Sequence, residues 1–181
     1  EGLVVGGAPG QDDDAGGVHV TPPVTPGGGG GFGPPQSSGC IIEAGVLVSC
    51  GKSVAIMGDT VVVGAPGATN PATNDPDAGM VEIFRILGLG KATMSITRVS
   101  TLRPIAGSGQ RLGTDVGINA TAVVAGAPDA PITLPGQGRG YVFLRPDGGF
   151  KAGETLPDAI IGSPANAQDD HFGAAVAVSE R

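Results

Sequence analysis

Three copies of one short, valine-rich pattern that closes with Gly-Ala-Pro constrain the fold of this chain more than any other feature. They occupy residues 4–9, 61–66 and 123–128 and align without gaps, with their prolines 57 and 62 residues apart. A repeated pattern at this spacing indicates similar units that stack on one another. We therefore expect one unit over residues 1–181, with repeats at approximately 1–49, 50–111 and 112–171, and with 172–181 starting a further copy.

Two further patterns flank each Gly-Ala-Pro and complete the unit. A segment that begins with glycine precedes it at residues 51–56 and 113–118. A further copy of this segment, led by Phe172-Gly173, lies at 172–178. Another segment follows Gly-Ala-Pro at 17–20, 79–84 and 140–144. These runs are rich in Val, Ile, Phe and Tyr, which strands prefer. The short turn at residues 57–60 predicts a hairpin, and the proline of Gly-Ala-Pro ends its second strand.

A weaker fourth strand is expected before each next copy, with candidates at residues 40–48, 95–102 and 150–156. The predicted fold class is therefore all-β, with four antiparallel strands per copy. Stacked radially, such four-stranded units are typical of β-propeller blades. The 34 glycines and 16 prolines suit a protein of many short strands and turns.

The patterns together resemble the FG-GAP repeat of integrin-alpha-like propellers and their bacterial relatives. Phe172-Gly173 carries the name-giving pair, while Cys50 and Leu112 replace the phenylalanine in two copies and are apolar enough for the same core position. The resemblance implies about three propeller blades, fewer than the usual four to eight. We therefore expect a partial propeller cut from a longer chain, an open array, or an oligomer that completes a ring. Residues 21–38, rich in Pro and Gly, are expected to be a loop insertion.

Charge and hydropathy exclude several partners. The net charge of −7 argues against nucleic acid and against anionic membrane surfaces. The chain has no run of about 18 apolar residues, so membrane insertion is not expected.

The residues predict no cofactor and only weak candidates for a metal site. Many FG-GAP repeats carry a calcium loop of the D-x-D-x-D-G kind between the first two strands, but the turns here, at 57–60 and 119–121, are too short for it. Acidic residues in the loops after Gly-Ala-Pro are interpreted as solvated, with a weak cation site as the alternative. The weak metal candidates are Asp12, Asp14, Asp75 and Asp77.

Covalent modification has two candidate sites. Cys40 and Cys50 are a candidate disulfide in a secreted protein, and two buried free thiols are the alternative. Asn119 begins an Asn-Ala-Thr sequon at a predicted hairpin tip and is a glycosylation candidate. No catalytic residue is predicted, because the chain has no Gly-x-Ser-x-Gly elbow and its Gly-Lys-Ser at residues 51–53 lacks phosphate-loop spacing.

These observations, with the resemblance, predict a secreted or cell-surface binding or adhesion scaffold and not an enzyme. Its loops after Gly-Ala-Pro, at residues 10–16, 67–78 and 129–139, are expected to lie on one face and to bind a protein or glycan partner. Two alternatives remain at this point. One is a structural repeat unit of a surface fibre or cell-wall array that binds copies of itself, and the other is an accessory propeller attached to a hydrolase.

Overall fold

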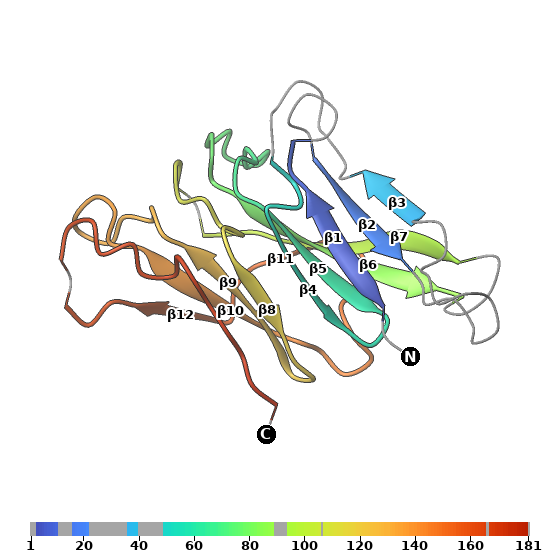
Figure 1. Ribbon diagram of the computed structural model, residues 1–181. Coiled ribbons are helices and arrows are strands. Elements are labelled where there is room, and N and C mark those ends of the chain that lie inside the picture. The colour runs from blue at the N-terminus through green and yellow to red at the C-terminus, as the bar shows by residue number, and fades with distance from the viewer. Residues whose placement is uncertain are drawn as a thin grey trace.

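The chain folds into β-sheets alone within the part that the computed structural model describes, which is residues 3–10, 16–21, 36–39, 49–88, 94–105, 107–165 and 167–180. The strands form three sheets that follow one another along the chain and lie side by side (Figure 1). None of the described residues belongs to a helix long and apolar enough to cross a membrane. The predicted all-β class is confirmed.

The first sheet has the strand order β1-β2-β3 and is antiparallel throughout. Its strands are β1 (Val4–Ala8), β2 (Gly17–Thr21) and β3 (Gln36–Gly39). Strand β3 corrects the expectation that residues 21–38 form only a loop. Pairing with β2 gives the backbone of residues 36–39 hydrogen-bond partners, so this stretch is the third strand of the sheet.

The second sheet holds the most complete copy, in the order β11-β7-β6-β5-β4. Its strands are β4 (Ser53–Met57), β5 (Thr60–Ala65), β6 (Met80–Leu87), β7 (Ser95–Leu102) and the short β11 (Glu154–Thr155). The predicted hairpin is confirmed, since Met57 pairs with Thr60 across a two-residue turn. The predicted fourth strand is confirmed as β7.

The third sheet has the order β12-β10-β9-β8. Its strands are β8 (Val116–Ile118), β9 (Ala122–Ala127), β10 (Arg139–Leu144) and β12 (Ala159–Gly162). The expectation that residues 150–156 form its fourth strand is wrong. Phe150 is only 5% exposed because it enters the core between the second and third sheets, and β11 consequently pairs in parallel with β7 of the second sheet. Strand β12 takes the fourth position instead.

Two hydrophobic cores hold the sheets together, and the second sheet contributes to both. On β5, Val61 and Val63 face the core shared with the first sheet, whereas Val62 faces the core shared with the third. This explains why the pattern of β5 is continuously apolar and not alternating. A strand buried on both faces needs no polar side.

The same junction joins each sheet to the segment that follows it. Isolated parallel bridges link Gly79 to Leu112 and Gly138 to Phe172, as Gly16 is linked to Cys50. Beside each bridge, the glycine of Gly-Ala-Pro packs on the carbonyl group of the glycine in the next copy, so that a Cβ at this position would overlap the oxygen. The glycine of each Gly-Ala-Pro is thus required, because the backbones of neighbouring copies approach too closely there for a side chain.

Candidate functional site

The described parts of the loops after Gly-Ala-Pro lie at one end of the sheets, which we call the loop end (residues 9–10, 66–79 and 128–138). This end lies toward the upper side of Figure 1, and the hairpin turns at residues 58–59 and 119–121 lie at the opposite, hairpin end. Backbone hydrogen bonds tie the second and third loops to the segments that lead into the next copy. Gly109 N donates to Pro76 O at 2.9 Å, and His171 N donates to Gly136 O at 2.8 Å.

A groove of about 490 Å³ opens at the loop end and draws its walls from all three copies. Its volume lies in the range of small-molecule and peptide side-chain sites. The lining residues are Pro9, Gly10, Ser49, Lys52, Pro66, Gly67, Asp77, Arg111 and Thr114. The groove is therefore a joint product of the repeat and not a feature of one loop.

One backbone position at the loop end is left-handed in every copy. Ser49, Arg111 and His171 have φ values of 45°, 56° and 49°, and each directly precedes the apolar residue that enters a sheet junction. Glycine adopts this conformation freely, whereas other residues are strained in it by about 1–3 kcal/mol. The chain nevertheless holds a polar side chain there three times. Such retained strain is typical of positions whose side chain has a function.

Ionisable side chains at the loop end form one chain of contacts, and Lys52 stands apart from it. Arg111 Nε lies 3.5 Å from one Asp129 oxygen, and His171 Nδ1 lies 3.2 Å from the other. Asp129 thus bridges two of the left-handed positions. Lys52 lines the groove without an ion pair among the described residues. All these side chains are at least a third exposed, so their ion pairs contribute little to stability and they are accessible to a ligand.

The structure describes two of the four acidic residues that the sequence offered as weak metal ligands, Asp75 and Asp77. Asp75 braces its loop, accepting hydrogen bonds from Thr73 Oγ1 at 2.6 Å and from Gly107 N at 2.9 Å. Asp77 lines the groove. Asp12 and Asp14 lie outside the described residues. Within the described ranges, no three side chains of the His, Cys, Asp and Glu types gather in a metal-binding arrangement.

The two modification candidates have different surroundings. Cys50 is buried and disulfide-bonded. Cys40 lies outside the described residues, so the pairing of the two stays a prediction. Asn119 is 9% exposed, its Oδ1 accepts from Ala122 N at 2.8 Å, and its Nδ2 donates to Ser179 O at 2.8 Å. A glycan on Asn119 therefore has to displace Ser179, and glycosylation stays a prediction under that condition.

Two groups with displaced pKa values lie inside the sheets, away from the groove. Burial raises the pKa of the Glu82 carboxyl, against the opposing effect of Arg98, whose Nη1 lies 3.2 Å from Glu82 Oε1. Burial likewise raises the pKa of the Tyr141 hydroxyl, which donates to Gln110 Oε1. Both residues belong to the interior, and neither lines the groove.

Sequence reasoning missed the residues that build the loop end most directly. Arg111, Asp129 and His171 belong to no motif with a known chemistry. The signal that could have found them is positional: the residue before the apolar-Gly pair is polar in every copy, while its neighbours follow the repeat.

Comparison with known proteins supports the repeat from an independent direction. A family model described as the FG-GAP repeat matches residues 49–84, which run from the first left-handed residue of the groove through β4 and β5 into β6. The comparison with curated proteins finds no match.

Proposed function

The chain contains an FG-GAP repeat at residues 49–84, and on that premise we propose that the three sheets are propeller-type blades that present the loop end to a protein or glycan partner. In this proposal the strands are a frame and the loop-end groove is the binding surface. FG-GAP repeats are typically extracellular, so we place this binding or adhesion role outside the cell or at its surface.

The observation that carries the proposal is the left-handed polar position repeated at the loop end. Ser49 and Arg111 both line the groove, and each is held by the backbone of its copy at a positive φ. Because the backbone is fixed, the side chains are oriented before any partner arrives, which lowers the entropic cost of binding. A repeat selected for stability alone would hold glycine at these positions.

The proposal favours binding over catalysis for a chemical reason. Catalytic acids and bases are recognised by perturbed pKa values inside a cleft. Glu82, whose pKa is raised, is buried within the second sheet and paired with Arg98, so a substrate in the groove could not reach it. The groove offers hydroxyl groups, prolines and single charges, which suit recognition of a polar partner.

The test is a binding screen of the fluorescently labelled chain against arrays of glycans and of extracellular proteins. Two substitutions probe the groove: Lys52→Thr, which introduces the residue that the next copy holds at this position (Thr114), and Arg111→Ser, which introduces the residue of Ser49. Lys151→Gln, an exposed charge outside the groove, is the matched control. We expect both groove variants to weaken a selective signal about tenfold, since each loses a charged hydrogen bond. Equal binding by all four proteins would overturn the proposal.

A further inference from the structure

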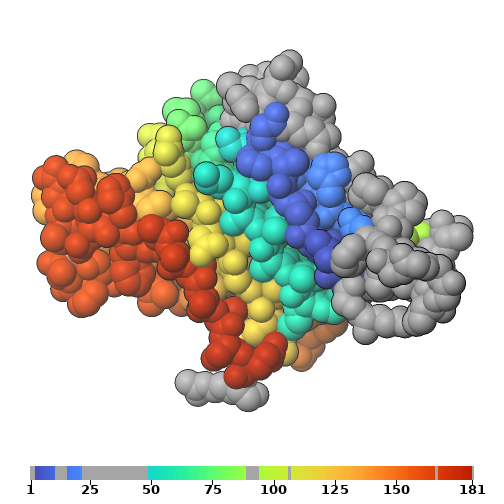
Figure 2. All heavy atoms as spheres, in the orientation of Figure 1, coloured from blue at the N-terminus to red at the C-terminus, as the bar shows by residue number. Residues whose placement is uncertain are grey.

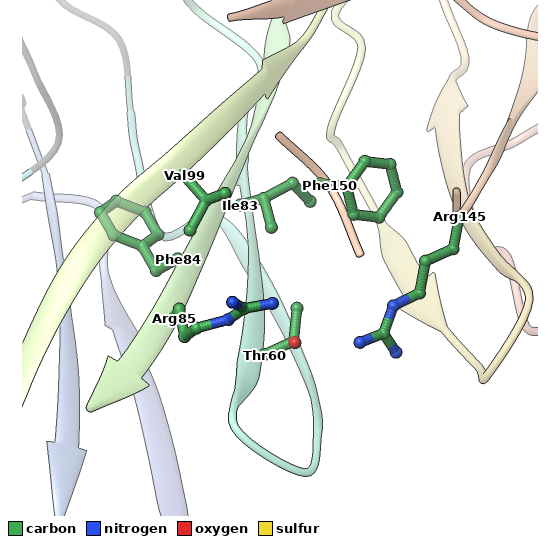
Figure 3. Close-up of a pocket in the computed structure, with 7 residues that line it drawn as sticks. All are labelled: Thr60, Ile83, Phe84, Arg85, Val99, Arg145 and Phe150. Atoms are coloured by element: carbon green, nitrogen blue, oxygen red, sulfur yellow. The ribbon is translucent and has the colours of Figure 1, made fainter. Parts of the chain in front are cut away.

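Two arginines face one another at the hairpin end, between the second and third sheets. Arg85 lies on β6 on the same face as Val81 and Ile83, which belong to the core shared with the third sheet. Arg145 follows β10 on the face of Tyr141 and Phe143, which belong to the same core. Figure 3 shows the two side chains reaching toward each other from opposite walls, with Thr60 between them.

The geometry at Gly149 shows how closely the two guanidinium groups converge. A methyl group built on Gly149 would lie 3.0 Å from Arg85 Nη2, 3.8 Å from Arg145 Nη2 and 3.9 Å from Arg145 Nε. The turn that places Gly149 there is closed by a 2.9 Å hydrogen bond from its N–H to Pro146 O. Glycine is favoured at this position because its φ is +88°, where other residues are strained.

The charges of this pair are only partly balanced. Arg85 Nε lies 3.7 Å from Asp59 Oδ2, which leaves the terminal nitrogens of Arg85 directed at the gap. Arg145 has no ion pair within the described part of the chain. In a chain with 17 acidic and 10 basic side chains, carboxylates are abundant, yet these two cations face each other. Two like charges that converge in this way repel one another, and an anion between them would offset the repulsion.

From this convergence we propose that Arg85 and Arg145 form a binding site for one tetrahedral oxyanion, a sulfate or phosphate group. Planar guanidinium groups donate paired hydrogen bonds that match the oxygens of such a group. The cavity between them is about 10 Å³, room for about one small atom, and is lined by Thr60, Phe84, Val99 and Phe150 with the arginines and Ile83. The Thr60 hydroxyl already donates to Asp59 Oδ1 at 3.2 Å, so the oxyanion would lie at the mouth of this cavity and be held by the two arginines.

The site is independent of the loop-end groove. It lies beside the hairpin turns, where Ile86 N donates to Asp59 O at 2.7 Å and Arg145 N donates to Thr121 O at 2.8 Å. Its walls come from two neighbouring sheets, so the bound group would join them. An oxyanion on a partner, such as a sulfate ester of a glycan, and a free inorganic anion share the chemistry that this site recognises.

The experiment is calorimetric titration of the chain with sodium sulfate and with sodium phosphate, at constant ionic strength maintained by sodium chloride. Arg145→Gln and Arg85→Gln should each lower the affinity about tenfold, because each removes charged hydrogen bonds. Arg145→Lys keeps the charge but loses the planar fork, and should weaken binding severalfold. Lys151→Gln removes a nearby exposed charge and should change the affinity less than about twofold.

The other outcomes are equally decisive. Absence of binding to the unmodified chain would overturn the proposal, and so would an equal loss in Lys151→Gln, which would mean general charge attraction. Circular-dichroism melting in chloride shows that each variant is folded, and a fold lost in Arg145→Gln leaves Arg145→Lys to decide. A sulfated disaccharide and its unsulfated form then distinguish the source: tighter binding of the sulfated sugar than of inorganic sulfate supports a partner-borne group, and equal binding supports the free anion.

Discussion

At the scale of single residues, two kinds of position carry most of the strain and most of the specificity of this molecule. Glycines at the junctions between copies allow backbone groups to approach where no side chain fits. The left-handed positions show the opposite pattern. Polar residues, Ser49, Arg111 and His171, lie at a positive φ that glycine would adopt without strain. The junction glycines explain why the Gly-Ala-Pro pattern is repeated. The strained polar residues identify the loop end as the candidate binding surface.

The junction glycines make a direct stability prediction. Gly64→Ala puts a methyl group onto the Gly113 carbonyl oxygen and the Ser53 side chain, and we expect it to cost about 3 kcal/mol or to prevent folding. Gly6→Ala is the control, because a Cβ there meets no atom within 4 Å, and it should change stability by less than about 1 kcal/mol. Urea denaturation measures the free energy of unfolding of each variant. Equal losses of stability would contradict the close backbone packing at the junction between copies.

Glu82 gives a prediction that depends on pH. A carboxyl whose pKa is raised by folding holds its proton more tightly in the folded chain, so its contribution to stability is present below the ordinary value of 4.5 and is lost as the pH rises through the folded value. Glu82→Gln stays neutral and should lack this loss. The free energy of unfolding of the variant, measured in urea, should therefore rise relative to the unmodified chain as the pH increases. A difference that does not change with pH would contradict the burial effect.

At the scale of elements, the segment of residues 172–180 lies beside the residues of β8 (Figure 2). It is not assigned as a strand of the third sheet. Side chains hold it there: Asp115 Oδ2 accepts from Val176 N at 2.7 Å, and Asn119 Nδ2 donates to Ser179 O at 2.8 Å. The segment occupies beside β8 the place that β8 occupies beside β4 in the preceding pair of copies. The further copy that the sequence predicts to begin at residue 172 stays a prediction.

Asn119→Asp tests how the segment is held. The substitution keeps the oxygen that accepts from Thr121 N and Ala122 N, and removes the nitrogen that donates to Ser179 O. We expect the turn to remain intact while the amides of residues 176–180 exchange hydrogen about fivefold faster, since one hydrogen bond is lost. Unchanged exchange in this segment would show that other contacts hold it.

Tyr141 links β10 to the segment before β8. Its hydroxyl donates to Gln110 Oε1, while Gln110 Nε2 donates to Ile105 O at 2.9 Å and to Gly107 O at 3.0 Å. Tyr141→Phe leaves a buried amide oxygen unpaired and should cost about 1–2 kcal/mol in urea denaturation. Tyr141→Leu, which also loses aromatic packing, should cost more, and a Tyr141→Phe variant as stable as the unmodified chain would contradict a contribution from the hydrogen bond.

The sequence predicted the strands that lie in the repeated patterns. It did not predict the strands that lie outside these patterns. Strands β4, β5, β6 and β9 follow from their apolar runs and from Gly-Ala-Pro. The sequence did not predict that β11 joins the second sheet while β12 takes the fourth position of the third sheet. This pairing depends on Phe150 entering a core formed by residues distant in sequence. The groove was expected only as a face of loops, and Arg111 and Asp129 come together through folding alone.

At the scale of the whole molecule, the three sheets separate two surfaces of different chemistry. The loop end carries a wide groove with a serine, a threonine and single charges, and the hairpin end carries the facing arginines. The acidic net charge of the chain repels anions at long range, so anion binding at the hairpin end depends on the two arginines and not on the charge of the whole surface. A partner that is long enough could contact both ends, but the proposed function rests on the loop end.

The most direct test of the central claim is hydrogen–deuterium exchange of the chain with and without the partner that the screen selects. The account predicts protection confined to the loop end, at residues 66–79, 109–114 and 128–138, with the hairpin turns at 58–59 and 119–121 unchanged. Protection centred on the hairpin turns, with the loop end unchanged, would contradict it.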